Sequence, residues 1–177
     1  NAAIIFNVRE NTWYDTGFAP GAQRTAGVFA PLFQYPVTFD ANLNDVTRYS
    51  LWQHETGTDE VASGMSNAIR SYITTANIDF VADGLSGQWA GLNRWVNYTR
   101  VEPDFVQTGD MTMTFSTKQT ARSTAVTTAY DFTPTTEYVD TRVQGRETTI
   151  TFESNVAGGD YQMGECLLHV KPGDARI

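Results

Sequence analysis

The sequence predicts an all-β protein in which an antiparallel β-sandwich follows a smaller hairpin region that resembles part of a β-propeller. About one residue in seven is threonine, and together with valine, isoleucine and the aromatic residues it gives a composition typical of half-buried strands. Several segments alternate apolar and polar residues at period two and are separated by turn-forming residues. With 177 residues, of which 41% are hydrophobic, the chain is long enough to bury a core in one domain or in two small ones.

The N-terminal segment predicts a β-hairpin. Residues 2–8 have the composition of a strand, residues 9–12 that of a turn, and residues 13–16 form the returning strand, which begins with Trp13. A strand followed by a polar turn and a tryptophan is typical of one edge of a propeller blade. This pattern is the reason for expecting a propeller-like part.

A polar break separates the hairpin region from the rest of the chain. Two short extended segments, residues 27–30 and 34–39, lie on either side of Pro31. Residues 40–45 are polar and indicate a linker. We therefore expect a propeller-blade-like hairpin region over residues 1–45 and a β-sandwich domain over residues 46–177.

The second domain opens with a strand and an ambiguous segment. Residues 48–53 alternate as a strand, and residues 54–64 predict a polar loop. Residues 61–73 fit the apolar spacing of either a helix or a strand. The β-branched residues that follow favour a strand, because branching at Cβ restricts the side chain in a helix.

Four further strands complete the predicted sandwich. Residues 95–101 form a strand that Pro103 ends, since proline cannot donate a hydrogen bond to a neighbouring strand. Residues 111–117 place Met111, Met113 and Phe115 on one face. The last two strands are residues 148–153 and 164–170, and residues 118–126 predict an exposed loop or arm. Strands at this spacing favour two packed antiparallel sheets.

Composition excludes several classes of function. The net charge of −8 argues against a surface that neutralises phosphates or anionic lipids. No apolar run approaches the roughly 20 residues that a membrane-spanning helix needs. The single cysteine, Cys166, excludes an internal disulfide and a cysteine-only zinc cluster, and we expect it to be a small buried side chain. Because the chain opens at Asn1 without an initiator methionine and enters an apolar run at once, we expect a processed product or the C-terminal part of a longer polypeptide.

No catalytic or metal-binding motif is present in full. His54 and Glu55 are followed by Thr58 where a zinc protease needs its second histidine. Residues 40–51 begin like a calcium loop but lack its glycine and its final glutamate. The nucleophile elbow and the glycine-rich nucleotide loops are absent from the sequence. We expect no catalytic, cofactor-binding or metal-binding residues.

The two histidines have ordinary structural interpretations. His54 lies beside Glu55, Asp59 and Glu60, a set that favours a solvated turn over a catalytic constellation. His169 lies in an apolar strand pattern and is expected to be a structural side chain with its polar atoms satisfied. Arginine outnumbers lysine ten to two, a bias that either marks an assembly surface or arises by chance.

Three segments resemble a known group of proteins. They are residues 26–33, residues 51–59 with their continuation to Phe80, and residues 142–146 with residues 161–164. Together they resemble the C-terminal region of tail hub or nozzle proteins of tailed bacteriophages, the group that includes packaged-DNA stabilisation proteins. In that pattern a blade-like hairpin precedes a Trp-x-His-Glu-x-Gly loop, an Arg-x-Pro-Asp-Phe-like stretch and an Arg-Gly-Arg-like turn. This chain departs from it in an extra polar insertion at residues 85–91 and in lacking most of the propeller.

The resemblance implies a non-enzymatic virion protein of the phage tail. Such a subunit forms a homo-oligomer, a hexameric ring, below the portal and adaptor proteins, where it extends the DNA channel and retains the packaged genome. The acidic composition suits a channel that DNA passes without specific binding, because carboxylates repel phosphate. No cofactor and no membrane are implied. The expected interface residues are Trp52, His54, Arg100, Arg142 and Arg146.

Two other functions stay open from the sequence. A carbohydrate-binding or receptor-binding β-sandwich could stack sugar rings on exposed tryptophans such as Trp89 and Trp95. A glycoside hydrolase would need two carboxylates across a cleft, which the sequence alone does not identify.

Overall fold

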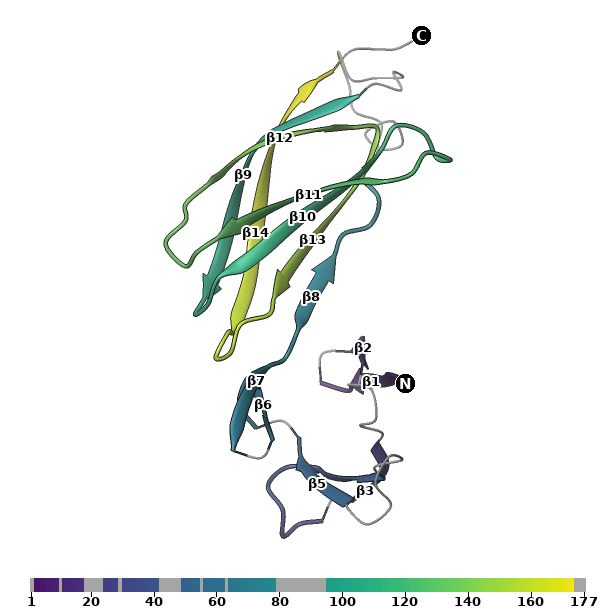
Figure 1. The fold of residues 1–177 in the computed structure, drawn as a ribbon, viewed down its shortest axis with the longest axis vertical. Helices are drawn as coiled ribbons and strands as arrows, with labels where there is room; N and C mark the ends of the chain where they lie inside the picture. The colour runs from purple at the N-terminus through teal and green to yellow at the C-terminus, as the bar shows by residue number, and fades with distance from the viewer. Residues whose placement is uncertain are drawn as a thin grey trace. The chain divides into compact units, whose positions relative to one another are not determined.

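The structure is a computed structural model that describes residues 2–9, 11–17, 24–28, 30–41, 49–54, 56–62, 64–78 and 95–173. All regular secondary structure within these ranges is β-strand, which confirms the predicted all-β class (Figure 1). Consequently, the described residues include no helix that is long and apolar enough to cross a membrane. The chain divides into two compact units, Asn1–Gly57 and Thr58–Ile177, each with its own sheets.

The first unit begins with the predicted hairpin. Strands β1 (Ala2–Asn7) and β2 (Thr12–Gly17) pair antiparallel, and Asn11 in the turn adopts a positive φ of 54°. Asparagine tolerates this left-handed conformation better than most residues. Phe6 lies opposite Trp13, with ring centroids 4.5 Å apart. The hairpin is confirmed, whereas its propeller-like character stays a prediction.

The rest of the first unit is an antiparallel sheet of three strands. Its order is β3 (Arg24–Val28), β4 (Val37–Ala41) and β5 (Tyr49–Gln53). Strand β5 was expected in the second domain, but it pairs along its length with β4. The first unit therefore continues to Gly57, beyond the boundary expected at residue 45. Most of the expected linker, residues 42–45, lies outside the described residues.

The second unit contains a β-sandwich of two antiparallel sheets (Figure 1). Sheet I has the order β11-β10-β13-β8, and sheet II has the order β12-β9-β14. The strands of sheet I are β8 (Ser71–Thr74), β10 (Met111–Lys118), β11 (Val126–Phe132) and β13 (Glu147–Ser154). The strands of sheet II are β9 (Val96–Gln107), β12 (Val139–Gly145) and β14 (Tyr161–Pro172).

Residues at alternate positions of both sheets fill the core between them. On β10, Met111, Met113 and Phe115 are buried as predicted, while the threonines between them face outward. The Phe115 ring lies 5.4 Å from the Tyr98 ring of sheet II, measured between centroids. The other fully or nearly fully buried apolar residues of this core are Val96, Val101, Phe132, Val143, Ile150 and Phe152.

A short hairpin precedes the sandwich within the second unit. The segment expected to be a polar loop, residues 54–64, contains strand β6 (Asp59–Ala62), which pairs with β7 (Met65–Ala68). The loop expectation is therefore wrong for Asp59–Ala62. The preference for strand over helix at residues 61–73 is confirmed, but these residues divide among β6, β7 and β8 and do not form one strand. The Asp59 carboxylate accepts a hydrogen bond from the Gly158 backbone N–H and connects this hairpin to the sandwich.

Strand β9 continues through Pro103, where the sequence predicted its end. Its pairing with β12 extends only as far as Val101, so no strand lies on that side of β9 at Pro103. Pro103 therefore has a paired strand on one side only, where it lies opposite Cys166 at an irregularity of β14, and edges and irregular pairings are the places where a sheet accepts proline. On the other side β14 follows β9 to Gln107, with an irregularity between Met163 and Cys166. Strand β14 is accordingly longer than the predicted residues 164–170.

Candidate functional site

The five residues expected at an interface divide between the two units. Trp52 lies on β5 and His54 directly follows it, both in the first unit. The three arginines belong to the second unit, with Arg100 on β9, Arg142 on β12, and Arg146 between β12 and β13. Sheet II thus carries two of the five residues, Arg100 and Arg142. No contact within the described residues joins all five.

His54 does not lie in a solvated turn. Its ring Nε2 is 2.6 Å from the Thr38 hydroxyl, and its backbone N–H donates to the carbonyl of Pro36 at 2.9 Å. The histidine is half-buried, and these contacts fasten the end of β5 to β4. Asp59 belongs to the second unit and accepts a hydrogen bond from Gly158 within that unit. Glu55 lies outside the described residues. The expected carboxylates do not form a catalytic set with His54 in the part of the chain that the structure describes.

Arg142 and Arg146 lie where the two sheets approach each other. The Arg142 backbone N–H donates to the Tyr130 hydroxyl of sheet I at 2.9 Å, and its side chain is exposed. The Arg146 backbone N–H donates to the carbonyl of Lys118 at 3.0 Å. Gly145 permits this turn, because a Cβ there would lie 2.7 Å from Cβ of Thr117.

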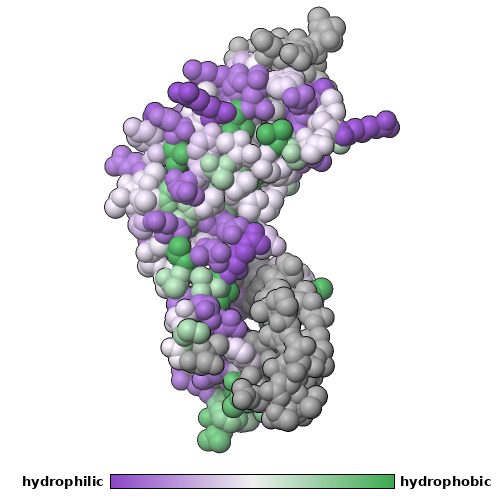
Figure 2. Space-filling model, in the orientation of Figure 1, coloured by the Kyte–Doolittle hydropathy of each residue, from purple (hydrophilic) through white to green (hydrophobic). Residues whose placement is uncertain are grey.

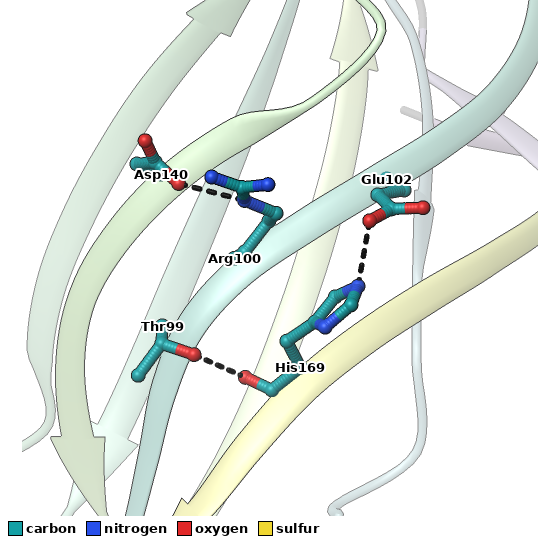
Figure 3. Close-up of polar contacts among 5 residues, drawn as sticks. All are labelled: Thr99, Arg100, Glu102, Asp140 and His169. Atoms are coloured by element: carbon teal, nitrogen blue, oxygen red, sulfur yellow. Dashed lines mark hydrogen bonds and ion pairs between the residues drawn. The ribbon is translucent and has the colours of Figure 1, made fainter.

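The outer face of sheet II carries a group of charged and aromatic side chains from all three of its strands or their ends. We call it the charged cluster. The pairing register places Arg100 of β9 between Asp140 of β12 and His169 of β14. Figure 3 shows the polar contacts of these strands. The members of the charged cluster are Arg100, Glu102, Tyr138, Asp140 and His169.

Arg100 is held by two neighbours at once. Its Nε donates to Oδ1 of Asp140 at 2.8 Å, and its guanidinium carbon lies 3.9 Å from the centre of the Tyr138 ring (Figure 3 shows the ion pair). The hydrogen bond to Asp140 raises the pKa of Arg100 above its ordinary value. The side chains of Arg100 and Asp140 remain 38% and 66% exposed, so the pair is fixed in position and still available to a partner.

His169 forms the second polar contact of the charged cluster. Its Nε2 lies 2.7 Å from Oε1 of Glu102, and its side chain is half-exposed (Figure 3). The expected satisfied structural role agrees with this contact, although the ring lies on the outer face. The nearby Thr99 hydroxyl donates to the backbone carbonyl of His169 at 3.1 Å and not to its ring. These residues therefore do not form the chain of nucleophile, base and acid that hydroxyl catalysis requires.

A hollow over the described residues is open and acidic. It has a volume of about 270 Å³ and is lined mainly by residues of sheet I and the turns beside it, with three carboxylates from Asp110, Asp131 and Glu153. Two of these carboxylates already have partners, since Asp131 accepts from Thr112 and Glu153 accepts two hydrogen bonds from Arg70. Among the described residues no three side chains of the metal-binding types lie close enough together to hold an ion.

Neither expected tryptophan provides an open platform in the described part of the second unit. Trp89 lies outside the described residues. Trp95 is half-buried, and its carbonyl accepts a hydrogen bond from the backbone N–H of Gly173 at 2.6 Å. Over the sandwich, Figure 2 shows mostly hydrophilic and intermediate residues with small separate apolar spots.

Comparison with known proteins identifies no relative of this chain: no protein-family model matches it, and no curated protein shows significant similarity. The site must therefore be interpreted from its own residues. Sequence reasoning found Arg100 but missed Glu102, Tyr138 and Asp140. A signal was present in β9, where Arg100, Glu102 and Asp104 recur at period two opposite the buried Val101. Such a pattern marks the solvent face of a strand.

Proposed function

We propose that the chain is a structural subunit of a multi-subunit assembly, and that this assembly is the tail of a bacteriophage, where the subunit acts as a hub or nozzle protein. The charged cluster carries the first part of the proposal. It presents a preformed arginine, an aromatic ring and carboxylates on an exposed sheet face. Arginine and tyrosine are the residues that protein interfaces favour.

The chemistry of the charged cluster suits recognition better than catalysis. Its ion pair between Arg100 and Asp140 and its contact between His169 and Glu102 are exposed and mutually satisfied, and no hydroxyl or thiol within the described residues is bonded to the imidazole of His169. Fixed side chains lose little conformational freedom when a partner binds. The cluster can therefore contribute to a specific contact without first reorganising.

The phage-tail part of the proposal rests on the sequence motifs. The resemblance covers the Trp-x-His-Glu-x-Gly motif, the stretch at residues 100–105 and residues 142–146, which the sequence predicted as a turn and which lie in β12 except for Arg146. The net charge of −8 is compatible with a channel subunit that DNA passes without adhering. In this role the subunit extends the DNA channel below the portal and adaptor and occurs as a ring of identical copies.

A charge reversal at Arg142 tests the proposal. Arg142 is exposed on the strand that supplies Asp140, whereas Arg122 is equally exposed in the loop between β10 and β11. Arg142→Glu and Arg122→Glu change the net charge by the same amount, so Arg122→Glu is the matched control. The variants would be supplied in trans to a phage from which the gene for this chain has been deleted. The copies per purified particle would then be counted by mass spectrometry.

We expect Arg142→Glu to reduce incorporation into particles and Arg122→Glu to leave it unchanged. Equal incorporation of both variants would remove this face from the assembly contact. Failure to find the wild-type chain in particles would refute the tail role. Saturable binding of the purified chain to a glycan array, together with its absence from particles, would favour the carbohydrate-binding alternative.

A further inference from the structure

We propose that strand β14 pairs antiparallel with β14 of a second copy of this chain, with Leu168 of one copy opposite Leu168 of the other. This inference goes beyond the proposed function and does not depend on a virion role, because it concerns the free edge of β14, which shares only His169 with the charged cluster. The pairing would join the two copies of sheet II into one continuous sheet.

Strand β14 has an unused edge. It spans Tyr161–Pro172 and pairs only with β9, so along its other side no strand of the described chain contributes backbone hydrogen bonds. A long edge of this kind is a template for another strand. The edges on the opposite side of the sandwich differ, because Tyr130 of β11 bonds to the backbone of Arg142 of β12 there and joins the two sheets.

Apolar side chains are exposed along this same side of the sandwich. On β14 Leu167 is 55% exposed, although it lies in the middle of the strand. The edge strand of sheet I, β8, lies close by, since the Ser71 hydroxyl is 3.3 Å from the Tyr161 hydroxyl. Tyr72 and Ile73 of β8 are also about half exposed. A second copy placed here would remove these apolar groups from water.

The charges on β14 indicate that the partner is another β14. Glu165 and Lys171 are both exposed and lie three residues on either side of Leu168, with Glu165 at the end of the irregularity between Met163 and Cys166. Neither has an ion pair among the described residues. In an antiparallel pair centred on Leu168, Glu165 of each copy lies opposite Lys171 of the other. The contact therefore contains two identical ion pairs related by a two-fold axis.

A pairing of the two β14 strands centred on Leu167 would give fewer charged side chains an oppositely charged partner. It would place Glu165 opposite His169, which already contacts Glu102 within its own chain. It would also place Lys171 opposite Met163. Strand register is fixed by the pairing that satisfies side chains on the same face, and the Leu168 centre does this for both charges.

Three variants of the full 177-residue chain test the register. Glu165→Lys and Lys171→Glu each place two pairs of like charges in the contact. The double variant E165K/K171E restores both ion pairs with their signs exchanged. Glu137→Lys, an exposed change between β11 and β12, controls for net charge. Sedimentation equilibrium gives the dimer dissociation constant, and circular dichroism confirms that each variant keeps its β-sheet content.

We expect the wild type, the double variant and Glu137→Lys to dimerise, and each single charge reversal to weaken the dimer about tenfold or more. A mixture of the two single variants supplies the sharpest result. One copy then carries two lysines and the other two glutamates, so the mixed dimer should form as tightly as the wild type. A wild type that stays monomeric, single variants that dimerise normally, or a mixture without recovery would each overturn the proposal.

Discussion

Replacing Phe115 by alanine should destabilise the sandwich strongly while leaving the first unit intact. Phe115 is completely buried at the centre of β10, and its ring contacts Tyr98 at 5.4 Å and Tyr130 at 6.0 Å between centroids. Removing a buried phenylalanine ring from contact loses about 1.5–3 kcal/mol of burial free energy. Each aromatic pair adds roughly 0.5–1.5 kcal/mol. The expected loss in unfolding free energy is therefore about 4 kcal/mol, within the usual range for Phe→Ala.

Amide hydrogen exchange measured by mass spectrometry can follow the two units separately in the intact chain. Peptides from β10 and β13 should exchange faster in Phe115→Ala by the factor that corresponds to this loss. Peptides from β3, β4 and β5 should not change, because they belong to the other unit. Val126→Ala, at a 60% exposed position on β11, is the control and should alter exchange little. Unchanged exchange of β10 in Phe115→Ala would refute the assigned core.

Two further predictions concern ionisable groups. The hydrogen bond from Arg70 lowers the pKa of Glu153 below its ordinary value of 4.5, so the pair stabilises the fold above about that pH and loses its effect as the pH falls through the lower folded-state pKa. Arg70→Gln should therefore lower the melting temperature near neutral pH, and the difference from wild type should shrink in acid to the part that comes from the contact of Arg70 with the Tyr72 ring, 4.5 Å from its centroid. A difference that does not change with pH would contradict the pairing of Arg70 with Glu153. Burial raises the pKa of the Cys166 thiol to about 11, so iodoacetamide should label the folded chain slowly at pH 8 and rapidly after urea is added. Equal labelling rates in both states would show that the thiol is accessible.

Period-two patterns predicted the centre of the sandwich well. Met111, Met113 and Phe115 were predicted on the buried face because successive side chains of a strand point to opposite sides, so alternate residues share one environment. The same rule could have found β11, where Val126, Thr128, Tyr130 and Phe132 face inward, but this strand was missed. Threonine at an inward position weakens the apolar signal, and Val126 lies at an exposed end of the strand. Strand β12 was missed for the same reason, because Thr141 and Gly145 occupy buried positions and weaken its apolar signal.

Other features depended on pairing that a single sequence does not reveal. Strand β9 passes Pro103 at a point where β12 no longer pairs with it and the pairing with β14 is irregular, which is a property of distant segments. The charged cluster brings residue 100 together with residues 138, 140 and 169 across three strands. Its members were visible as charges, but their proximity follows from strand order and register. The division after Gly57 likewise follows from the pairing of β5 with β4.

The order of strands in the sandwich also constrains when it can fold during synthesis. The first strand of sheet I, β8, pairs with β13, and the central strand of sheet II, β9, pairs with the last strand, β14. Sheet I is therefore complete only after β13 has emerged from the ribosome as far as Ser154, and sheet II only after β14 has emerged as far as Pro172. Contacts so distant in sequence form slowly, since a long loop must close before they stabilise the fold. The nascent sandwich should consequently keep open strand edges until β14 has emerged, and chaperone binding would be most useful before that point.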